Sequence, residues 1–264
     1  MINLSVMPRR LLWALLLLGS TCAPALAAQP AASPSPAPTA TPDPDPCGGL
    51  HTDILATLNR PTVGFSACAV KPRETLAELG YQNEASLSGI ITPTYPQGFI
   101  RFGVGPNFEA DLIAPEGHYD SGVGLKYELY HDAKTAYAID VLYTSPNGAP
   151  AFTAGKATTT VNFNAGTSLG GKFNGGITLG YQRGAFTTWL PSVSLVDQFS
   201  PKTQVYVEAF GATRVRVDGG SRFAYDGGIQ HLLTNDLEID VEAGRTVTDV
   251  DRSHYYGFGF GLRL

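Results

Sequence analysis

Apolar and polar residues alternate along most of the chain between Glu74 and Leu264. The last segment shows this period most clearly: one face carries Tyr256, Phe258, Phe260, Leu262 and Leu264, and the other carries Gly257, Gly259, Gly261 and Arg263. Successive side chains point to opposite faces in a β-strand, whereas a helix repeats every 3.6 residues. The pattern therefore predicts strands.

Twelve such segments follow one another, and the gaps between them are alternately long and short. The short gaps are rich in Gly, Pro, Asn and Ser, which suit hairpin turns. An even number of strands with short turns at one end and long loops at the other is typical of bacterial outer-membrane barrels. The predicted strands are Glu74–Asn83, Gly98–Val104, Phe108–Ala114, Ser121–Tyr130, Thr135–Thr144, Thr159–Gly171, Gly175–Gln182, Trp189–Gln198, Thr203–Ala212, Ser221–His231, Asp236–Thr246 and Ser253–Leu264.

Alternation alone does not distinguish a barrel in lipid from a soluble sandwich. The charged side chains decide between them, because a dry soluble core could not hold so many charges. A closed barrel can hold them in its lumen while all backbone groups pair between strands. We therefore predict a 12-stranded antiparallel transmembrane outer-membrane β-barrel. Its lumen-facing residues are predicted to be Glu78, Arg101, Glu109, Asp111, Lys126, Glu128, Asp140, Glu208, Asp226, Glu238, Asp240, Glu242 and Arg263.

The opposite, apolar face of the predicted strands is expected to contact outer-membrane lipid and lipopolysaccharide. Aromatic residues near strand ends would then lie in the membrane interfaces, among them Tyr130, Tyr143, Trp189 and Tyr255. Two segments fit this scheme poorly. Pro191 interrupts the eighth predicted strand, and Tyr206 and Phe210 share the face of Glu208 in the ninth. A register shift or a bulge is expected in this region.

The residues before the barrel divide into three parts. Residues 1–27 form a predicted signal peptide, with two arginines, a short leucine-rich run and an Ala-Leu-Ala cleavage site. Residues 28–46 are rich in proline and are predicted to be a disordered periplasmic linker. Residues 47–73 are predicted to be a short periplasmic segment, and residues 74–264 the barrel, so the product is expected in the outer membrane of a Gram-negative cell.

Cys47 and Cys68 are the two cysteines that remain after removal of the signal peptide. Because an exported chain folds under oxidising conditions, we expect them to form a disulfide. The remaining chain carries 16 basic and 23 acidic residues, a net charge of −7, without a basic cluster. Nucleic-acid binding is therefore not expected.

Motifs that suggest catalysis or metal binding have plainer interpretations. Gly166-Thr167-Ser168-Leu169-Gly170 matches a nucleophile-elbow pattern, but a strand follows it instead of a helix. The five histidines lack the spacing of a compact metal site. Asp249 and Asp251 suit a solvated acidic loop, and Gly257–Gly261 lacks a following helix and is interpreted as allowing barrel curvature. We predict no enzymatic activity, no metal and no cofactor.

The chain resembles a bacterial outer-membrane β-barrel family whose members are labelled as transporters or as meta-pathway phenol-degradation proteins. The residues that carry the resemblance are Asn59-Arg60-Pro61-Thr62, Ser66-Ala67-Cys68, Leu76-Ala77-Glu78-Leu79-Gly80-Tyr81 and Gly124-Leu125-Lys126-Tyr127. The resemblance implies passage of small hydrophobic or aromatic compounds across the outer membrane. The final strand, Tyr256–Leu264, is similar to the strand by which the barrel-assembly machinery recognises such proteins, although it ends on leucine instead of an aromatic residue.

Two hypotheses for the function follow. The first is a passive channel for small-molecule solutes through an acidic lumen, which would favour cations because the predicted lumen has ten carboxylates and three cations. The alternative is a structural or adhesive barrel with a plugged lumen, whose loops Glu84–Gln97 and Ser145–Thr158 bind a partner. Twelve strands lie between filled and porin-sized barrels, so the strand number leaves both open.

Overall fold

The computed structural model describes residues 46–47, 54–60, 62–86, 91–94, 97–115, 120–148, 155–215, 219–248 and 253–264. The predicted signal peptide and nearly all of the predicted linker lie outside these residues. So do Asp249, Asp251 and parts of the long loops. Residues 40–264 form one compact unit, to which everything below refers.

The described chain contains one short helix and thirteen strands. Among the described residues, no helix is long and apolar enough to cross a membrane. The elements are α1 (Ile54–Thr57), β1 (Thr75–Ser86), β2 (Ile91–Thr94), β3 (Gln97–Gly105), β4 (Phe108–Pro115), β5 (Gly122–His131), β6 (Thr135–Thr144), β7 (Thr158–Gly170), β8 (Phe173–Arg183), β9 (Thr187–Ser200), β10 (Thr203–Ala212), β11 (Arg222–Leu232), β12 (Leu237–Thr246) and β13 (Ser253–Arg263).

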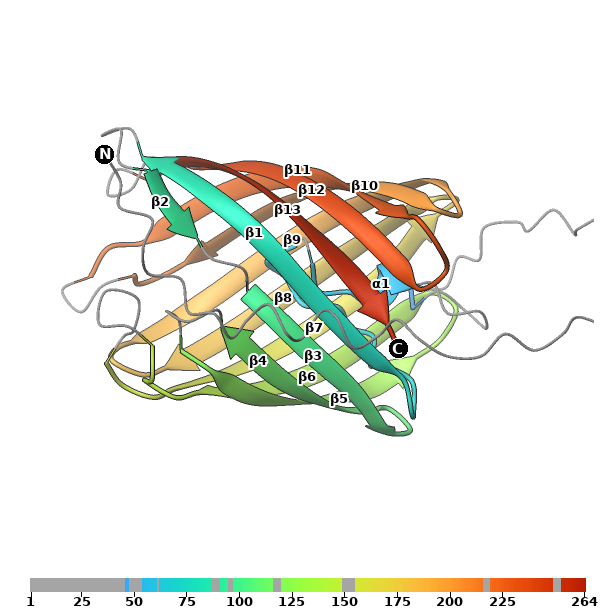
Figure 1. The fold of residues 1–264 in the computed structure, drawn as a ribbon, viewed down its shortest axis with the longest axis horizontal. Coiled ribbons are helices and arrows are strands. Elements are labelled where there is room, and N and C mark those ends of the chain that lie inside the picture. Colours follow the sequence, from blue (N-terminus) through green and yellow to red (C-terminus); the bar gives the residue numbers. More distant parts are fainter. Residues whose placement is uncertain are drawn as a thin grey trace, which may run out of the picture. The chain divides into compact units, whose positions relative to one another are not determined.

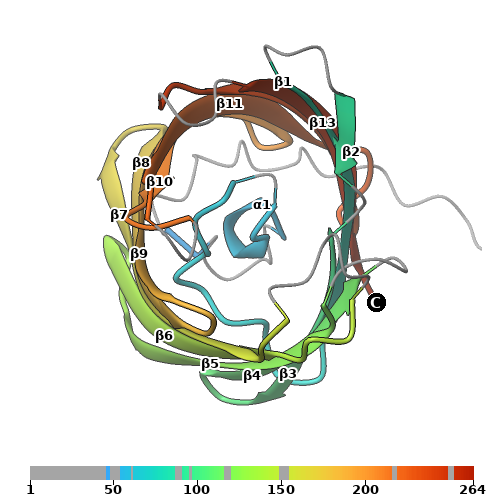
Figure 2. The same ribbon diagram turned by 90° about the vertical axis from the view of Figure 1, so that its left-hand side faces the viewer.

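The strands form a single antiparallel sheet that closes on itself. Each strand from β3 to β13 pairs with the next along the chain, and β13 pairs with β1 from Leu76↔Arg263 to Ser86↔Ser253. Figure 1 shows β1 lying along β13, and Figure 2 shows the resulting ring of strands. Closure removes the free edges that β1 and β13 would have in an open sheet. The prediction of a 12-stranded barrel is confirmed, because β2 and β3 share one position in the wall.

That shared position corrects one predicted loop. β3 pairs with the first half of β1, from Thr75 to Leu79, and β2 pairs with the second half, from Gln82 to Ala85. The segment Glu84–Gln97 had been predicted as a loop throughout. Instead β1 continues to Ser86, because β2 supplies hydrogen-bonding partners for the second half of β1.

The two ends of the barrel differ as predicted. Five connections are short: β3–β4, β5–β6, β7–β8, β9–β10 and β11–β12. The chain terminus lies at the same end, because the Leu264 amide donates to the Thr75 carbonyl at 2.9 Å. We call it the short-turn end, and the opposite one the long-loop end. At the β7–β8 turn, Gly170 and Gly171 have φ values of 102° and 62°, which favour glycine.

The outer surface is apolar and the interior is polar, the reverse of a soluble protein. Exposed outer residues include Val123, Leu125, Ile139, Val141, Leu179, Ile239, Val241 and Phe258. The β6 strand shows the alternation plainly, since Ala136, Ala138 and Asp140 are buried while Tyr137 and Ile139 are exposed. An apolar exterior with a polar interior is the arrangement of an outer-membrane barrel.

The irregularity predicted around Pro191 is absent. Pro191 pairs with Leu179 without a register shift between β8 and β9. Its side chain lies on the exposed face, and the register of β9 with β10 ends at the neighbouring residue, Ser192, so the missing N–H interrupts no residue pair with β10. The bulge in this region lies instead at the short-turn end of β9 and β10, beside Thr203 and Gln204. Tyr206 simply faces the interior, where it is almost fully buried.

Candidate functional site: the charged lumen and the segment inside it

The lumen is occupied by the residues that precede β1. We call the described part of residues 46–73 the luminal segment. Figure 2 shows this segment, including α1, inside the ring of strands. The sequence had been interpreted as placing residues 47–73 in the periplasm, and this interpretation is wrong. The segment lies in the barrel because its backbone amides and carbonyls are partners for charged side chains on the interior wall.

Carboxylates of the wall accept hydrogen bonds from backbone amides of the luminal segment. Glu78 and Glu208 each accept two such bonds, and Glu109 and Glu128 each accept one. The donors and distances are Asn59 and Arg60 to Glu78 (2.9 Å each), Val63 and Gly64 to Glu208 (2.7 and 2.8 Å), Ala69 to Glu128 (3.1 Å) and Val70 to Glu109 (2.7 Å). Hydrogen bonds to a charged acceptor are stronger than neutral ones. Four strands of the wall therefore hold the segment.

Arg101 on β3 joins the wall to the luminal segment and is fully buried. Its guanidinium donates two hydrogen bonds to Glu109, at 2.8 and 3.0 Å, and one to Glu78 at 2.7 Å. It also donates to the backbone carbonyls of Thr57 at 2.5 Å and Cys68 at 3.5 Å. The planar, five-donor guanidinium can serve all these acceptors at once. Arg101 therefore holds two separate parts of the luminal segment, at Thr57 and at Cys68, at the same point of the barrel wall.

Lys126 on β5 continues this network. Its ammonium donates to the Ser66 carbonyl at 3.0 Å and lies 3.7 Å from a carboxylate oxygen of Glu109 and of Asp140. Asp140 also accepts a hydrogen bond from the side-chain amide of Asn164. The wall formed by β3 to β6 thus combines its carboxylates with two buried cations that both reach the luminal segment.

The opposite wall carries five carboxylates: Glu208 on β10, Asp226 on β11, and Glu238, Asp240 and Glu242 on β12. We call these five residues the acidic wall. All are buried. The luminal segment places Arg60 against it, with Nη2 at 3.2 Å from Asp240 and 3.9 Å from Glu242. Burial lowers the pKa of Arg60, but the negative charges of Asp240 and Glu242 outweigh this effect and raise it, so Arg60 stays charged.

Several groups of the acidic wall lack partners. Oδ2 of Asp240 and Oδ1 of Asp226 have no hydrogen-bond partner within the described part of the chain. Oδ2 of Asp226 accepts a hydrogen bond from the Tyr255 hydroxyl at 2.7 Å. Buried charges without partners are costly. The acidic wall therefore has more carboxyl groups than the one guanidinium beside it, that of Arg60, can pair with.

Small residues of the wall make room for the luminal segment. A Cβ atom at Gly80 would lie 1.8 Å from Cζ of Arg60, and one at Gly261 would lie 2.6 Å from a methyl carbon of Leu58. At Gly103 it would lie 1.8 Å from the Lys71 carbonyl oxygen. The glycines of β13 had been interpreted as allowing curvature. In the structure Gly259 and Gly261 provide space for Arg60 and Leu58 of the luminal segment, and Gly257 provides space for the side chain of Glu242.

The disulfide expected from the sequence links Cys47 and Cys68, 21 residues apart. Both residues pack with Ala67 and Ala136 in a small apolar cluster. The disulfide therefore closes the luminal segment into a loop inside the barrel. Cys47, Glu128 and His131 bring one ligand atom each to within 4.8 Å of one another, but the Cys47 sulfur is already bonded to Cys68 and is not a thiolate ligand.

Removal of the disulfide should loosen the luminal segment while leaving the barrel closed. The paired substitution Cys47→Ser and Cys68→Ser should destabilise the closed loop by about 3 kcal/mol, since the unfolded segment regains its conformational freedom. Limited proteolysis of protein refolded in detergent should then cleave residues 47–68 faster, while the heat-modifiable gel shift of the barrel remains. Equal cleavage rates for the two proteins would contradict this prediction.

Comparison with known proteins agrees with the fold described above. Residues 76–264 match the profile of a family described as "Putative MetA-pathway of phenol degradation". The chain belongs to this family. No curated protein matches the chain in sequence.

Solved structures of outer-membrane channels share this fold. The COG4313 outer membrane channel from Pseudomonas putida F1 is 12% identical, with 74% of this chain and 97% of that chain covered and a TM-score of 0.56. The NanC porin is also 12% identical, with 72% and 100% covered and a TM-score of 0.52. The KdgM porin is 9% identical, with 70% and 98% covered and a TM-score of 0.50. At these identities the likeness establishes an outer-membrane barrel fold.

The structure places twelve of the thirteen predicted lumen residues at buried interior positions. The buried ones are Glu78, Arg101, Glu109, Asp111, Lys126, Glu128, Asp140, Glu208, Asp226, Glu238, Asp240 and Glu242. Arg263 lies at the short-turn end, where its guanidinium bonds to the exposed Asp236 at 2.5 Å.

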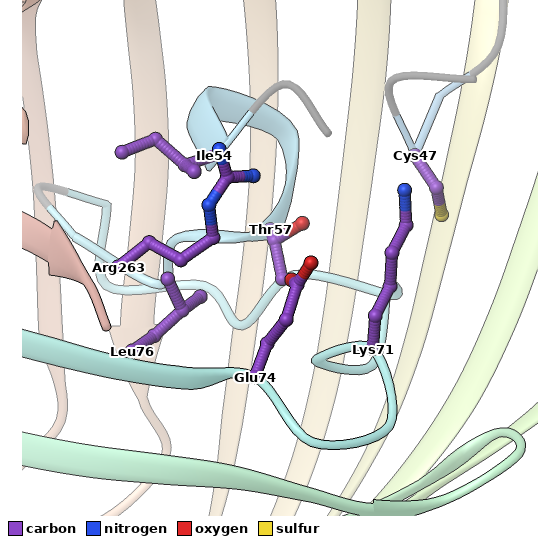
Figure 3. A pocket seen from close by; sticks show the side chains of 7 residues that line it. All are labelled: Cys47, Ile54, Thr57, Lys71, Glu74, Leu76 and Arg263. Atoms are coloured by element: carbon purple, nitrogen blue, oxygen red, sulfur yellow. The ribbon is translucent and has the colours of Figure 1, made fainter. Parts of the chain in front are cut away.

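A small pocket of about 10 Å³ lies beside Arg263, enough for about one water molecule. Figure 3 shows that its lining includes Cys47, Ile54 and Lys71 of the luminal segment and Glu74 and Leu76 at the start of the barrel. The pocket is a gap between the luminal segment and the barrel. It is too small for an organic solute.

Two interior residues were missed or misplaced by sequence reasoning, and one motif was interpreted correctly. Arg60 was missed because it precedes the strands. There, no alternation of apolar and polar residues shows which way a side chain points. Tyr255 had been assigned to the membrane interface, but it is buried and its hydroxyl donates to Asp226. Its place on the same face as Gly257 and Gly259 could have revealed this. Ser168 lies in β7 with β8 directly after it, which is not a nucleophile elbow.

Proposed function

We propose that this protein is a passive outer-membrane channel for small solutes, narrowed in its short-turn half by the luminal segment. The surplus of buried carboxylates on the acidic wall carries the proposal. Carboxylates that line a pore select for cations. The way in which the luminal segment is bound is consistent with a narrow passage. Contacts with wall side chains hold the segment, and it is not paired into the sheet.

The charge of the lumen defines the solutes that we propose. The described interior carries ten carboxylates, and its cations Arg101, Lys126 and Arg60 are paired with some of them. Cations and neutral compounds should therefore pass more readily than anions. The family description names phenol degradation, so neutral phenols are the first organic solutes to test. Transport would be diffusion down a gradient and would need no cofactor.

Neutralising the carboxylates of β12 should reduce the preference for cations. With Glu238→Gln, Asp240→Asn and Glu242→Gln combined, the reversal potential in a potassium chloride gradient across a planar bilayer should move toward zero, because three of the ten interior carboxylates lose their charge. Glu74→Gln is the matched control, since this residue lies at the short-turn end before β1. An unchanged reversal potential in the triple variant would show that these carboxylates of the acidic wall do not line the conduction path.

The occupied lumen also favours a second candidate function, a structural or adhesive barrel whose long loops bind a partner. Conductance of the wild-type chain separates the two. A channel should conduct in repeated preparations, and the disulfide-free variant should conduct more. Absence of conductance in both proteins would overturn the channel proposal and leave the structural barrel.

The cellular setting forms part of the proposal. Residues 1–27 would direct export and be removed, and the short-turn end would face the periplasm, where the proline-rich linker would also lie. The exposed apolar residues of the strands would contact outer-membrane lipid and lipopolysaccharide, and β13 would be recognised by the barrel-assembly machinery. Fractionation of washed outer membranes and N-terminal sequencing of the mature protein test these points.

A further inference from the structure

We propose that Arg245 on β12 and His254 on β13 form a binding site on the outer surface of the barrel for a phosphate group of lipid A, the phosphorylated lipid of lipopolysaccharide. The inference rests on the proposed outer-membrane setting and deepens it, because it assigns one headgroup to particular residues. Three observations carry it. The two basic residues are register partners, neither side chain has a partner in the described part of the chain, and an apolar surface continues along their strands.

Arg245 and His254 lie opposite each other on the outer face of the barrel, at its long-loop end. They are register partners between β12 and β13. Both are exposed, whereas Thr246 and Tyr255 beside them are buried. Side chains directly opposite in an antiparallel pair have Cβ atoms about 4.5–5.5 Å apart. The guanidinium and the imidazole can therefore reach one anion together.

Neither basic side chain is neutralised by the protein around it. No ion pair or side-chain hydrogen bond links Arg245 or His254 to another of the described residues. The exposed Lys172 at the short-turn end differs, because it pairs with Asp197 at 2.9 Å. A guanidinium and a protonated imidazole in opposite positions repel each other, and like charges placed in this way destabilise a sheet. An anion bound between them removes this repulsion.

The donors of this pair suit a phosphate group. A guanidinium offers parallel N–H groups that match two phosphate oxygens, and an imidazole offers at least one N–H in either protonation state. Tyr225 on β11 is the register partner of Arg245 on the other side and is also exposed. Exposed aromatic residues near strand ends lie at the level of the headgroups in outer-membrane barrels. The row Tyr225, Arg245 and His254 therefore lies at the depth of the lipid phosphates.

An apolar surface for acyl chains continues from the basic pair toward the short-turn end. On the outer face of β12 and β13 it consists of the register pairs Ala243–Tyr256, Val241–Phe258 and Ile239–Phe260, all exposed. Six residues separate Arg245 from Ile239, which is about 20 Å along a strand tilted by about 45° and roughly 14 Å across the membrane. One leaflet of the hydrocarbon core is about 15 Å thick. A lipid with its phosphate at the pair would therefore place its acyl chains on this surface.

Native mass spectrometry of the full-length chain, refolded in detergent and titrated with diphosphoryl lipid A, tests the proposal. Arg245→Gln should weaken binding about tenfold, because the charge-assisted hydrogen bonds to the phosphate are lost. His254→Gln should weaken it severalfold. Dephosphorylated lipid A should bind the wild type as weakly as diphosphoryl lipid A binds Arg245→Gln. Inorganic phosphate at the same concentration should not displace the lipid, because it has no acyl chains to contact β12 and β13.

Arg183→Gln is the matched control. Arg183 is exposed on the outer face of β8 at the same end of the barrel, but its register partners are Thr159 and Thr187. The substitution makes the same change in net charge where no second basic residue lies opposite, so binding of lipid A should equal that of the wild type.

Equal affinity of the wild type and Arg245→Gln would overturn the proposal, and so would an equal loss in Arg183→Gln. The heat-modifiable gel shift shows whether each variant has refolded. If Arg245→Gln does not refold, His254→Gln serves alone, and unchanged affinity there also overturns the proposal. The measurement does not depend on conduction, so lipid binding without conductance would reject only the channel, and conductance without lipid binding only the phosphate site.

Discussion

Replacing Arg101 with glutamine should lower the free energy of unfolding of the barrel by about 3–5 kcal/mol. The buried guanidinium is the common partner of Glu78 and Glu109 and of two carbonyls of the luminal segment. Glutamine cannot serve both carboxylates, so uncompensated negative charge would remain in the interior. Urea titration of the protein in lipid vesicles measures the change through the fluorescence of Trp189, the one tryptophan outside the predicted signal peptide.

Arg263→Gln provides the control for this measurement. Arg263 also pairs with a carboxylate, but its partner Asp236 is 57% exposed. Pairs of this kind are worth about 0–1 kcal/mol. The same chemical substitution should therefore have a small effect at the short-turn end and a large one in the lumen. Similar losses for both variants would show that the interior network does not determine stability.

Gly80→Ala should raise the conductance of the full-length protein severalfold. The new methyl group would lie 1.8 Å from Cζ of Arg60, so the guanidinium would have to leave its place between β1 and β13. Its hydrogen bond to Asp240, a charge-assisted contact worth about 1.5–3 kcal/mol, would be lost. The luminal segment would then keep its backbone hydrogen bonds to the wall and its contacts with Arg101 and Lys126, but would lose its side-chain contact with the acidic wall. Single-channel recording in planar bilayers measures the change.

The matched substitution is Gly166→Ala, on the interior face of β7. There the added methyl would meet Ala67 at 3.6 Å and Pro46 at 3.7 Å, which are ordinary contacts. Its conductance should equal that of the wild type. If Gly80→Ala and Gly166→Ala conduct alike, contact between Arg60 and the glycines does not control the passage.

Much of the barrel could be predicted, because the alternation of polar and apolar side chains along a membrane strand shows both that it is a strand and which face points inward. On β12, Glu238, Asp240 and Glu242 alternate with Leu237, Ile239 and Val241, and the structure buries the first set and exposes much of the second. Water and lipid on opposite faces impose this alternation on nearly every strand. Where one face carries mixed residues, as with Tyr206 beside Glu208, the pattern did not show which way they point.

The position of residues 54–73 could not be predicted in this way. The contacts that hold them link residues far apart along the chain, such as Gly64 and Glu208, which are 144 residues apart. Most of the donors are backbone amides, which every residue except proline carries, so no residue type marks them. The glycines that make room for Arg60 and Leu58 have the same appearance in the sequence as glycines that serve curvature.

The sequence by itself determined the number of strand positions in the wall, the face on which most side chains lie, the end at which the turns are short, and the cysteine pair, because each depends on local period, turn chemistry or residue count. Only the tertiary structure decided what fills the lumen. Closure of the sheet brings the carboxylates of ten different wall positions around one enclosed space, and buried charges there stabilise whichever donors can reach them. The residues before β1 can reach these carboxylates because they are joined directly to the start of the barrel wall.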